Sequence, residues 1–162
     1  MRNKDTLKIS PTGDRELVIT RLFDAPHEMV FDAFTKPPLL KKWLLGPPGW
    51  TMPTCTVDLK VGGIYRYVWR NDEGEELGVQ GTFKEIIRSV KLVHTEKFDE
   101  AWYPGESVLT TTLSNKSGKT LLTGTIVYES KEARDMVVAS GMEEGVGLSY
   151  DNLEEILRKS QH

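Results

Sequence analysis

Residues 120–160 read TLLTGTIVYESKEARDMVVASGMEEGVGLSYDNLEEILRKS, and the change of pattern within them decides the fold. Up to Tyr128 the segment is rich in β-branched and apolar residues, which is typical of a strand. Beyond it, small and apolar residues recur at helical spacing, at Met142, Val146, Ser149, Leu153, Ile156 and Leu157. The segment therefore predicts a strand over 120–128, followed by one long or broken helix over about 131–159.

The predicted helix has a defined start and an unusual middle. Ser130 is a favourable cap, and Glu132 lies near the positive end of the helix. Gly141 is expected to interrupt or kink the helix, and each glycine from there to Gly147 weakens it by roughly 1 kcal/mol relative to alanine. Two interpretations stay open: the small residues let the helix approach a sheet closely, or they leave room beneath it for a bound molecule.

Upstream of residue 120 the chain alternates between strand patterns and turn signals. Residues 16–23 predict the first strand, and the Asp24–Pro26 segment predicts a helix start with Pro26 in the first turn. That helix ends before Pro37, and a second short helix is expected at 39–44. Five further strands are expected at 51–59, 64–70, 77–87, 91–98 and 107–113.

Seven strands and a closing helix define the predicted architecture. Strands joined by short turns pair antiparallel, and one face of such a sheet needs a cover that the final helix supplies. The sequence therefore predicts an α+β fold, in which an antiparallel sheet wraps around a long C-terminal helix and two short helices follow the first strand. Residues 15–160 are expected to form one domain, and residues 1–14, with Pro11 and Gly13, a flexible N-terminal arm.

Composition excludes several classes of protein. The net charge is −3 with both signs mixed, so the basic footprint of a nucleic-acid binder is missing. No run of about 18 apolar residues exists, so no membrane insertion is expected. The N-terminus lacks the apolar core of a signal peptide, and Cys55 is the only cysteine, so a cytoplasmic location is expected.

Three histidines are the first candidates for acid–base chemistry. His27 is expected to be solvated at a helix start and His162 disordered at the terminus, whereas His94 lies inside a predicted strand. No two histidines have metal-ligand spacing, so neither a metal site nor a cofactor is expected. The chain also lacks a nucleophile elbow and a glycine-rich phosphate loop.

Aromatic residues carry the clearest sign of a binding site. Tyr65, Tyr67 and Trp69 are two residues apart, so they share one face of a strand. Such rings suit an apolar pocket with a few polar anchors, although plain core packing is the alternative. The predicted ligand-binding residues are Trp43, Tyr65, Tyr67, Trp69, Phe83, His94, Trp102, Met142 and Val146.

Several short motifs, taken in order, resemble one known family. They are Phe23-Asp24-Ala25-Pro26 with residues 30–34, Trp43-Leu44-Leu45-Gly46-Pro47, Asp58 to Gly63 with Tyr65-Arg66-Tyr67, residues 81–86, residues 91–93 and residues 141–145. Over roughly residues 15 to 158 the chain resembles the activator of heat-shock-protein-90 ATPase homologue-like family, of the START and birch-pollen-allergen (SRPBCC) superfamily.

The resemblance implies the helix-grip fold, a seven-stranded antiparallel sheet that grips the C-terminal helix around a cavity. It implies no universal catalytic set, because members of the superfamily include lipid binders, cyclases and co-chaperone domains. Family members often carry tryptophan after the closing-helix glycine, whereas this chain has Val146 after Gly145. A smaller residue at that position enlarges or reshapes the implied pocket.

Three functions are therefore compared. The first is binding of a small apolar or aromatic molecule under the closing helix. The second is an enzyme in the same cavity, of cyclase or hydrolase type, with His94 as the acid–base group and Tyr65, Tyr67 and Asp58 as helpers. The third is a co-chaperone-like regulator of the heat-shock-protein-90 ATPase, with the chaperone as a partner. A homodimer is possible through the exposed edges of the sheet.

Overall fold

The structure is a computed structural model and describes residues 3–161, so the expectations for Met1, Arg2 and His162 lie outside it. In chain order its elements are η1 (Asn3–Thr6), β1 (Lys8–Thr12), β2 (Glu16–Phe23), α1 (His27–Thr35), α2 (Pro37–Trp43), β3 (Thr51–Val57), β4 (Ile64–Arg70), β5 (Glu76–Ile87), β6 (Lys91–Phe98), β7 (Ser107–Lys116), β8 (Lys119–Val127), α3 (Lys131–Ala139) and α4 (Met142–Ser160).

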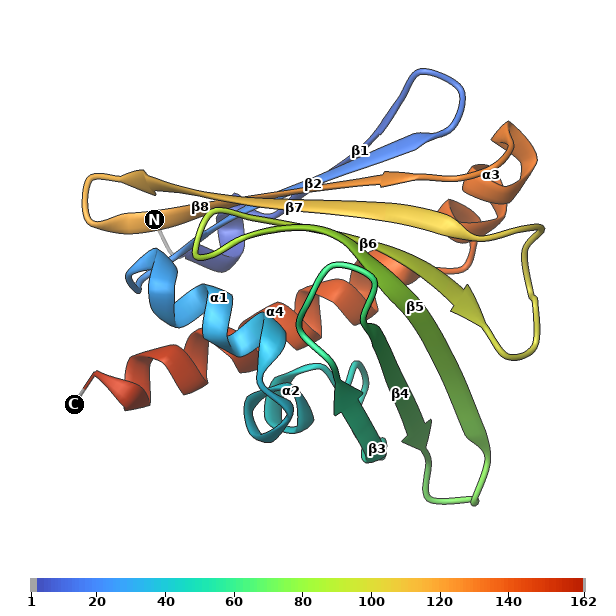
Figure 1. Cartoon of the computed structure of the whole chain (residues 1–162), viewed down its shortest axis with the longest axis horizontal. Helices are drawn as coiled ribbons and strands as arrows, with labels where there is room; N and C mark the ends of the chain where they lie inside the picture. The colour runs from blue at the N-terminus through green and yellow to red at the C-terminus, as the bar shows by residue number, and fades with distance from the viewer. Residues whose placement is uncertain (1–2, 162) are drawn as a thin grey trace.

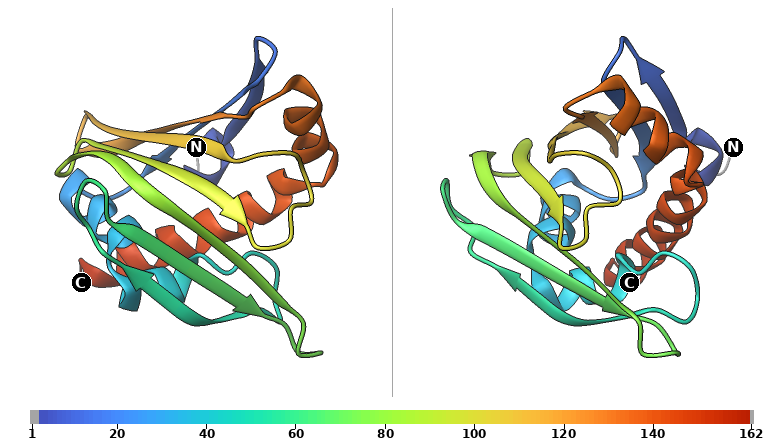
Figure 2. Two further views of the ribbon diagram at one scale, coloured as in Figure 1. Left: turned by 45° about the vertical axis from the view of Figure 1, so that its right-hand side comes forward. Right: turned by 90° about the vertical axis from the view of Figure 1, so that its right-hand side faces the viewer.

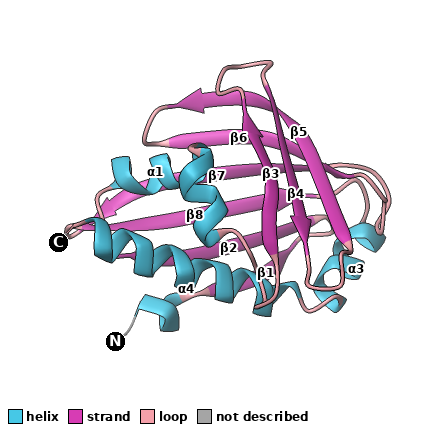
Figure 3. Cartoon of the chain, turned by 90° about the horizontal axis from the view of Figure 1, so that it is seen from below, coloured by secondary structure: helices cyan, strands magenta, loops and turns pink. Residues whose placement is uncertain are grey.

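The strands form one antiparallel sheet in the order β1-β2-β8-β7-β6-β5-β4-β3 (Figure 1). A register shift between Phe83 and Glu85 marks a bulge where β5 pairs with β6, and bulges bend and twist a sheet locally. The sheet curves around α4, and α1 and α2 lie on the same concave face (Figures 2 and 3). The predicted α+β architecture, with a sheet wrapped around the C-terminal helix, is confirmed.

The sheet has eight strands, whereas the sequence predicted seven. The additional strand is β1, which lies inside the segment 1–14 that was expected to be an arm. It pairs antiparallel with β2, with Ile9 opposite Ile19, after a turn in which Gly13 has φ 56°. Because β1 is short and carries a single strongly apolar residue, its pattern is weak, and Pro11 is tolerated because β1 is an edge strand.

The helix boundaries follow from local chemistry. Pro26 is the N-cap of α1 rather than part of its first turn, and its carbonyl oxygen accepts hydrogen bonds from the backbone N–H groups of Met29 and Val30. Helix α2 begins at Pro37, two residues earlier than expected, because proline suits the first turn of a helix. The last helix is broken: Gly141 has φ 81°, which separates α3 from α4.

Helix α4 is held in the concave face by polar contacts to three different segments. The Arg21 guanidinium of β2 is buried and lies 3.0 Å from the Asp151 carboxylate. The Glu154 carboxylate accepts a hydrogen bond from the Asp24 backbone N–H at 3.1 Å, and the Ser149 hydroxyl accepts one from the Gly46 N–H at 2.9 Å. These contacts fix the position of α4 relative to the sheet. None of the helices among residues 3–161 has both the length and the apolar character needed to cross a bilayer.

The buried core is divided into two clusters. The first core cluster lies beneath α1, α2 and the C-terminal half of α4, and it consists of Phe23, Ala25, Val30, Phe31, Ala33, Leu40, Trp43, Tyr65, Phe83, Leu92, Leu113, Leu122, Leu153 and Leu157. The second core cluster lies toward α3, and it consists of Leu17, Ile19, Tyr103, Ile126, Tyr128, Ala133 and Val137. Tyr150 of α4 is only partly buried and packs against both clusters, so it lies where they meet.

Candidate functional site

A run of contacting rings crosses the concave face of the sheet. Tyr65, Tyr67 and Trp69 of β4 follow one another, with ring centroids 4.9 Å apart for the first pair and 5.9 Å for the second. The Trp69 indole N–H donates a hydrogen bond of 2.6 Å to the Leu44 carbonyl oxygen, just after α2. The alternation expected for β4 therefore places its three rings together, and the indole ties this strand to the helical layer.

Phe83 of β5 and His94 of β6 extend this run. Their centroids lie 5.6 Å and 5.0 Å from the Tyr65 ring centroid. The Tyr65 hydroxyl donates a hydrogen bond of 2.5 Å to the Thr95 carbonyl oxygen. The His94 Nδ1 atom lies 3.1 Å from the Tyr65 hydroxyl oxygen and 3.2 Å from the Thr95 carbonyl oxygen. Because a carbonyl oxygen only accepts, Nδ1 is assigned as the protonated nitrogen, which leaves the Nε2 lone pair free. Burial lowers the pKa of His94, so the ring is neutral at pH 7.

The other predicted residues lie around this run. Trp43 is enclosed in the first core cluster, and its indole N–H donates to the Ala33 carbonyl oxygen at 2.8 Å. Trp102 is 37% exposed in the loop after β6, where it contacts Phe98. Met142 and Val146 of α4 are partly buried against the second core cluster. Five of the nine predicted residues thus form one contacting set, Met142 and Val146 pack against the second core cluster instead, and both Trp43 and Trp102 lie outside the set.

A carboxylate that sequence reasoning missed lies on the same face. Glu96 is two residues after His94 in β6, so both side chains leave the strand on one side. Its register partner in β7 is Ser107, whose hydroxyl lies 3.3 Å from the Tyr103 hydroxyl. The Tyr103 ring in turn contacts the Tyr128 ring, with centroids 5.4 Å apart. The sequence signal for this residue is the period of two that begins at His94 and reaches Glu96.

Four side chains in this region lie deep in the protein and are still accessible to solvent. Tyr67, His94, Glu96 and Tyr150 are densely surrounded by protein atoms. Each nevertheless keeps part of its surface accessible to solvent. A group that is deep yet accessible borders space that protein atoms do not fill. These four groups come from β4, β6 and α4, and among them Tyr150 packs against both core clusters and Tyr67 against the first.

The electrostatics of the site are dominated by Glu96. Burial raises the pKa of its carboxyl to about 7, and no ion pair or hydrogen bond found among residues 3–161 reaches it. Burial, and after it the charge of Glu96, raises the pKa of Tyr65 above the usual range, and burial, then Cys55, then Glu96 do the same for Tyr67. The Tyr103 pKa rises to about 12, chiefly through burial, with a smaller contribution from the Glu96 charge. The tyrosines therefore stay protonated at physiological pH.

The glycines of α4 bear on the two interpretations of the closing helix. A methyl group placed on Gly145 meets no atom within 4 Å, and one on Gly147 meets only the Leu7 side chain, at 3.5 Å. Neither position brings the helix backbone against the sheet. The structure therefore favours open space at Gly145 over close helix–sheet contact.

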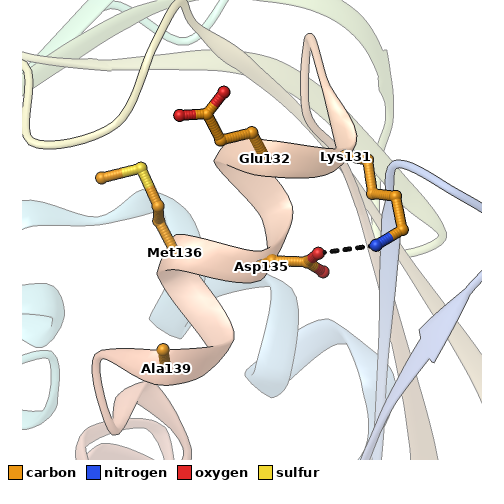
Figure 4. Close-up of a pocket in the computed structure, with 5 residues that line it drawn as sticks. All are labelled: Lys131, Glu132, Asp135, Met136 and Ala139. Atoms are coloured by element: carbon orange, nitrogen blue, oxygen red, sulfur yellow. Dashed lines mark hydrogen bonds and ion pairs between the residues drawn. The ribbon is translucent and has the colours of Figure 1, made fainter.

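A separate hollow lies on the outer surface of α3 (Figure 4). It is an open depression of about 540 Å³, lined by Lys131, Glu132, Asp135, Met136 and Ala139. The Lys131 ammonium and the Asp135 carboxylate pair across one turn at 2.9 Å, and the Met136 side chain is 40% exposed. All five residues belong to one helix, so this is a shallow surface feature. Within the described chain, no three His, Cys, Asp or Glu side chains gather as a metal site.

Comparisons with known proteins match both sequence and fold. The family described as Activator of Hsp90 ATPase homolog 1-like protein matches residues 24–158. A crystal structure of a protein from Rhodobacter sphaeroides is 34% identical with a TM-score of 0.90, covering 96% of this chain and 99% of its own. One from Nitrosomonas europaea is 27% identical with a TM-score of 0.82, covering 93% and 99%.

More distant relatives share the fold alone. The solution structure of an AHSA1-like protein from Aeromonas hydrophila is 18% identical with a TM-score of 0.68, covering 86% of this chain and 93% of its own. The search of curated proteins returned no match.

Proposed function

This chain belongs to the Activator of Hsp90 ATPase homolog 1-like protein family, and from that premise we propose that it binds a small hydrophobic or aromatic molecule between the sheet and α4. The observation that carries the proposal is the set of deep side chains on β4, β6 and α4 that keep accessible surface. Protein interiors are close-packed, so such side chains indicate space that protein atoms do not fill.

The lining has the composition of a ligand site. The rings of Tyr65, Tyr67, Trp69 and Phe83 offer apolar area, and burial of such area is worth roughly 25 cal/mol per Å². Met142 and Val146 supply aliphatic surface from α4. A few polar groups, among them the free His94 Nε2 atom, orient a ligand without dominating the surface.

A fluorescence titration with the neutral apolar probe N-phenyl-1-naphthylamine tests the proposal. The probe is expected to gain fluorescence on binding, with a dissociation constant in the micromolar range. Val146→Trp should fill the space and weaken probe binding by at least about tenfold. Asn152→Trp, at an exposed position of the same helix, is the matched control and should leave binding unchanged.

The stability of the same variants shows whether the region around Val146 is open space or packed core. Val146→Trp should fold with little loss of stability if space exists, whereas overpacking a filled core costs about 1–3 kcal/mol. The proposal fails if the probe does not bind to the wild-type protein. It also fails if both tryptophan variants bind the probe as the wild type does.

A further inference from the structure

We propose that the preferred ligand of this site is a cation, an apolar or aromatic molecule that carries a protonated amine, with Glu96 as its counter-ion. The inference rests on the proposed function and adds the charge of the ligand. It starts from the position of Glu96, which leaves the concave face of β6 beside His94 and opposite Ser107 of β7.

The protein supplies no counter-charge for this carboxylate. Among residues 3–161, neither the ion pairs nor the side-chain hydrogen bonds include Glu96, whereas the other deep carboxylate, Glu154, lies 3.7 Å from Arg21 and accepts the Asp24 N–H. A carboxylate taken from water without a partner is costly. An ammonium group of a ligand would provide the missing partner, which makes Glu96 a recognition group rather than a structural one.

The surroundings of Glu96 suit a cation as well. The pKa values of Tyr65, Tyr67, Tyr103 and Tyr128 respond to the charge of Glu96, and the Tyr103 hydroxyl lies 3.3 Å from the hydroxyl of Ser107, the register partner of Glu96. Aromatic faces attract ammonium groups, and phenol oxygens accept hydrogen bonds from them. Because the four phenols stay protonated, they add no second negative charge.

The backbone at Gly81 allows the Tyr65 ring to lie close to β6. Gly81 of β5 is the register partner of Tyr65, and a methyl group added there would lie 2.7 Å from the Tyr65 Cε1 atom and 1.8 Å from the Thr95 carbonyl oxygen. Only glycine allows the Tyr65 ring to lie over β5 against β6. The Tyr65 hydroxyl thereby reaches the Thr95 carbonyl oxygen, in the residue that precedes Glu96.

The arrangement also predicts a pH dependence. The titratable groups whose pKa values respond to the charge of Glu96 are Tyr65 and Tyr67 of β4, Tyr103 of the following loop and Tyr128 after β8, and His94 leaves the same face of β6. A cation binds the ionised form of Glu96. Affinity for a cation should therefore rise as pH increases through about 7 and level off above it. Protonation of His94 at lower pH would repel a cation and act in the same direction.

Competition against N-phenyl-1-naphthylamine at pH 8 tests the charge preference. The competitors are 1-naphthylmethylamine, 1-naphthalenemethanol and 1-naphthoate, which share a ring system and differ in charge. The amine should bind at least about tenfold more tightly than the alcohol, and the carboxylate more weakly than the alcohol. Glu96→Gln should abolish the preference for the amine and retain affinity for the alcohol. Glu100→Gln, at an exposed position just after β6, is the control and should keep the preference.

The outcomes separate this inference from the proposed function. Binding of the neutral probe with equal affinity for amine and alcohol would leave the proposed function standing and overturn the inference. A preference for the amine that survives in Glu96→Gln would overturn it too. Absence of probe binding would overturn both.

Discussion

At the scale of single residues, His94 and Glu96 leave the same face of β6 two residues apart. Because His94 lies in a strand, its side chain could face either the interior or the solvent. Its contact with Tyr65 shows that it faces the interior. Glu96 follows from the same alternation, but a glutamate in a strand is ordinarily read as solvated. The ring contact between Tyr103 and Tyr128 joins the loop after β6 to the end of β8, and it is a property of the whole fold that no local pattern contains.

The burial of Glu96 predicts a cost to stability. Its carboxyl pKa is raised from 4.5 to about 7, so the folded state binds more protons than the unfolded state between these values, and stability falls as pH rises through this window. Ionised Glu96 should cost up to about 3 kcal/mol above pH 7, less where water reaches it. Glu96→Gln is therefore expected to be more stable than the wild type at pH 8 and similar to it near pH 4, by urea denaturation. A less stable variant at pH 8 would contradict this account.

At the scale of elements, the strongest patterns gave reliable boundaries. The three aromatic residues of β4 and the capped start of α3 at Lys131 lie where periodicity and Ser130 placed them, with the Ser130 hydroxyl accepting the Ala133 N–H. The miss at β1 has a physical cause, since its five residues depend on pairing with β2 rather than on their own pattern. The break at Gly141 was expected, although its left-handed backbone was not.

Two glycines of the closing helices should respond oppositely to alanine. Gly145 is inside α4 with open space around it, so Gly145→Ala should raise the free energy of unfolding by up to about 1 kcal/mol. Gly141 has φ 81°, so Gly141→Ala should lower it by about 1 kcal/mol. Chemical denaturation of both variants measures the difference. Equal effects would show that the α3–α4 break does not depend on the left-handed conformation.

At the scale of the whole molecule, the sequence and the resemblance both predicted a sheet wrapped around its last helix, and this architecture is confirmed. The division of the core was not predictable, because it depends on how far α4 stands from the concave face. That position is fixed by long-range contacts such as Arg21 with Asp151, which are 130 residues apart in sequence. The proposed function therefore depends on the space between these layers.

The most direct test is to locate the bound probe. Intermolecular nuclear Overhauser effects from N-phenyl-1-naphthylamine should reach the methyl groups of Met142 and Val146 together with the ring protons of Tyr67. Together these residues represent both walls of the proposed site, α4 and the sheet. Contacts confined to Met136 and Val138 on the exposed surface of α3 would contradict the account, because they would place the probe outside the fold.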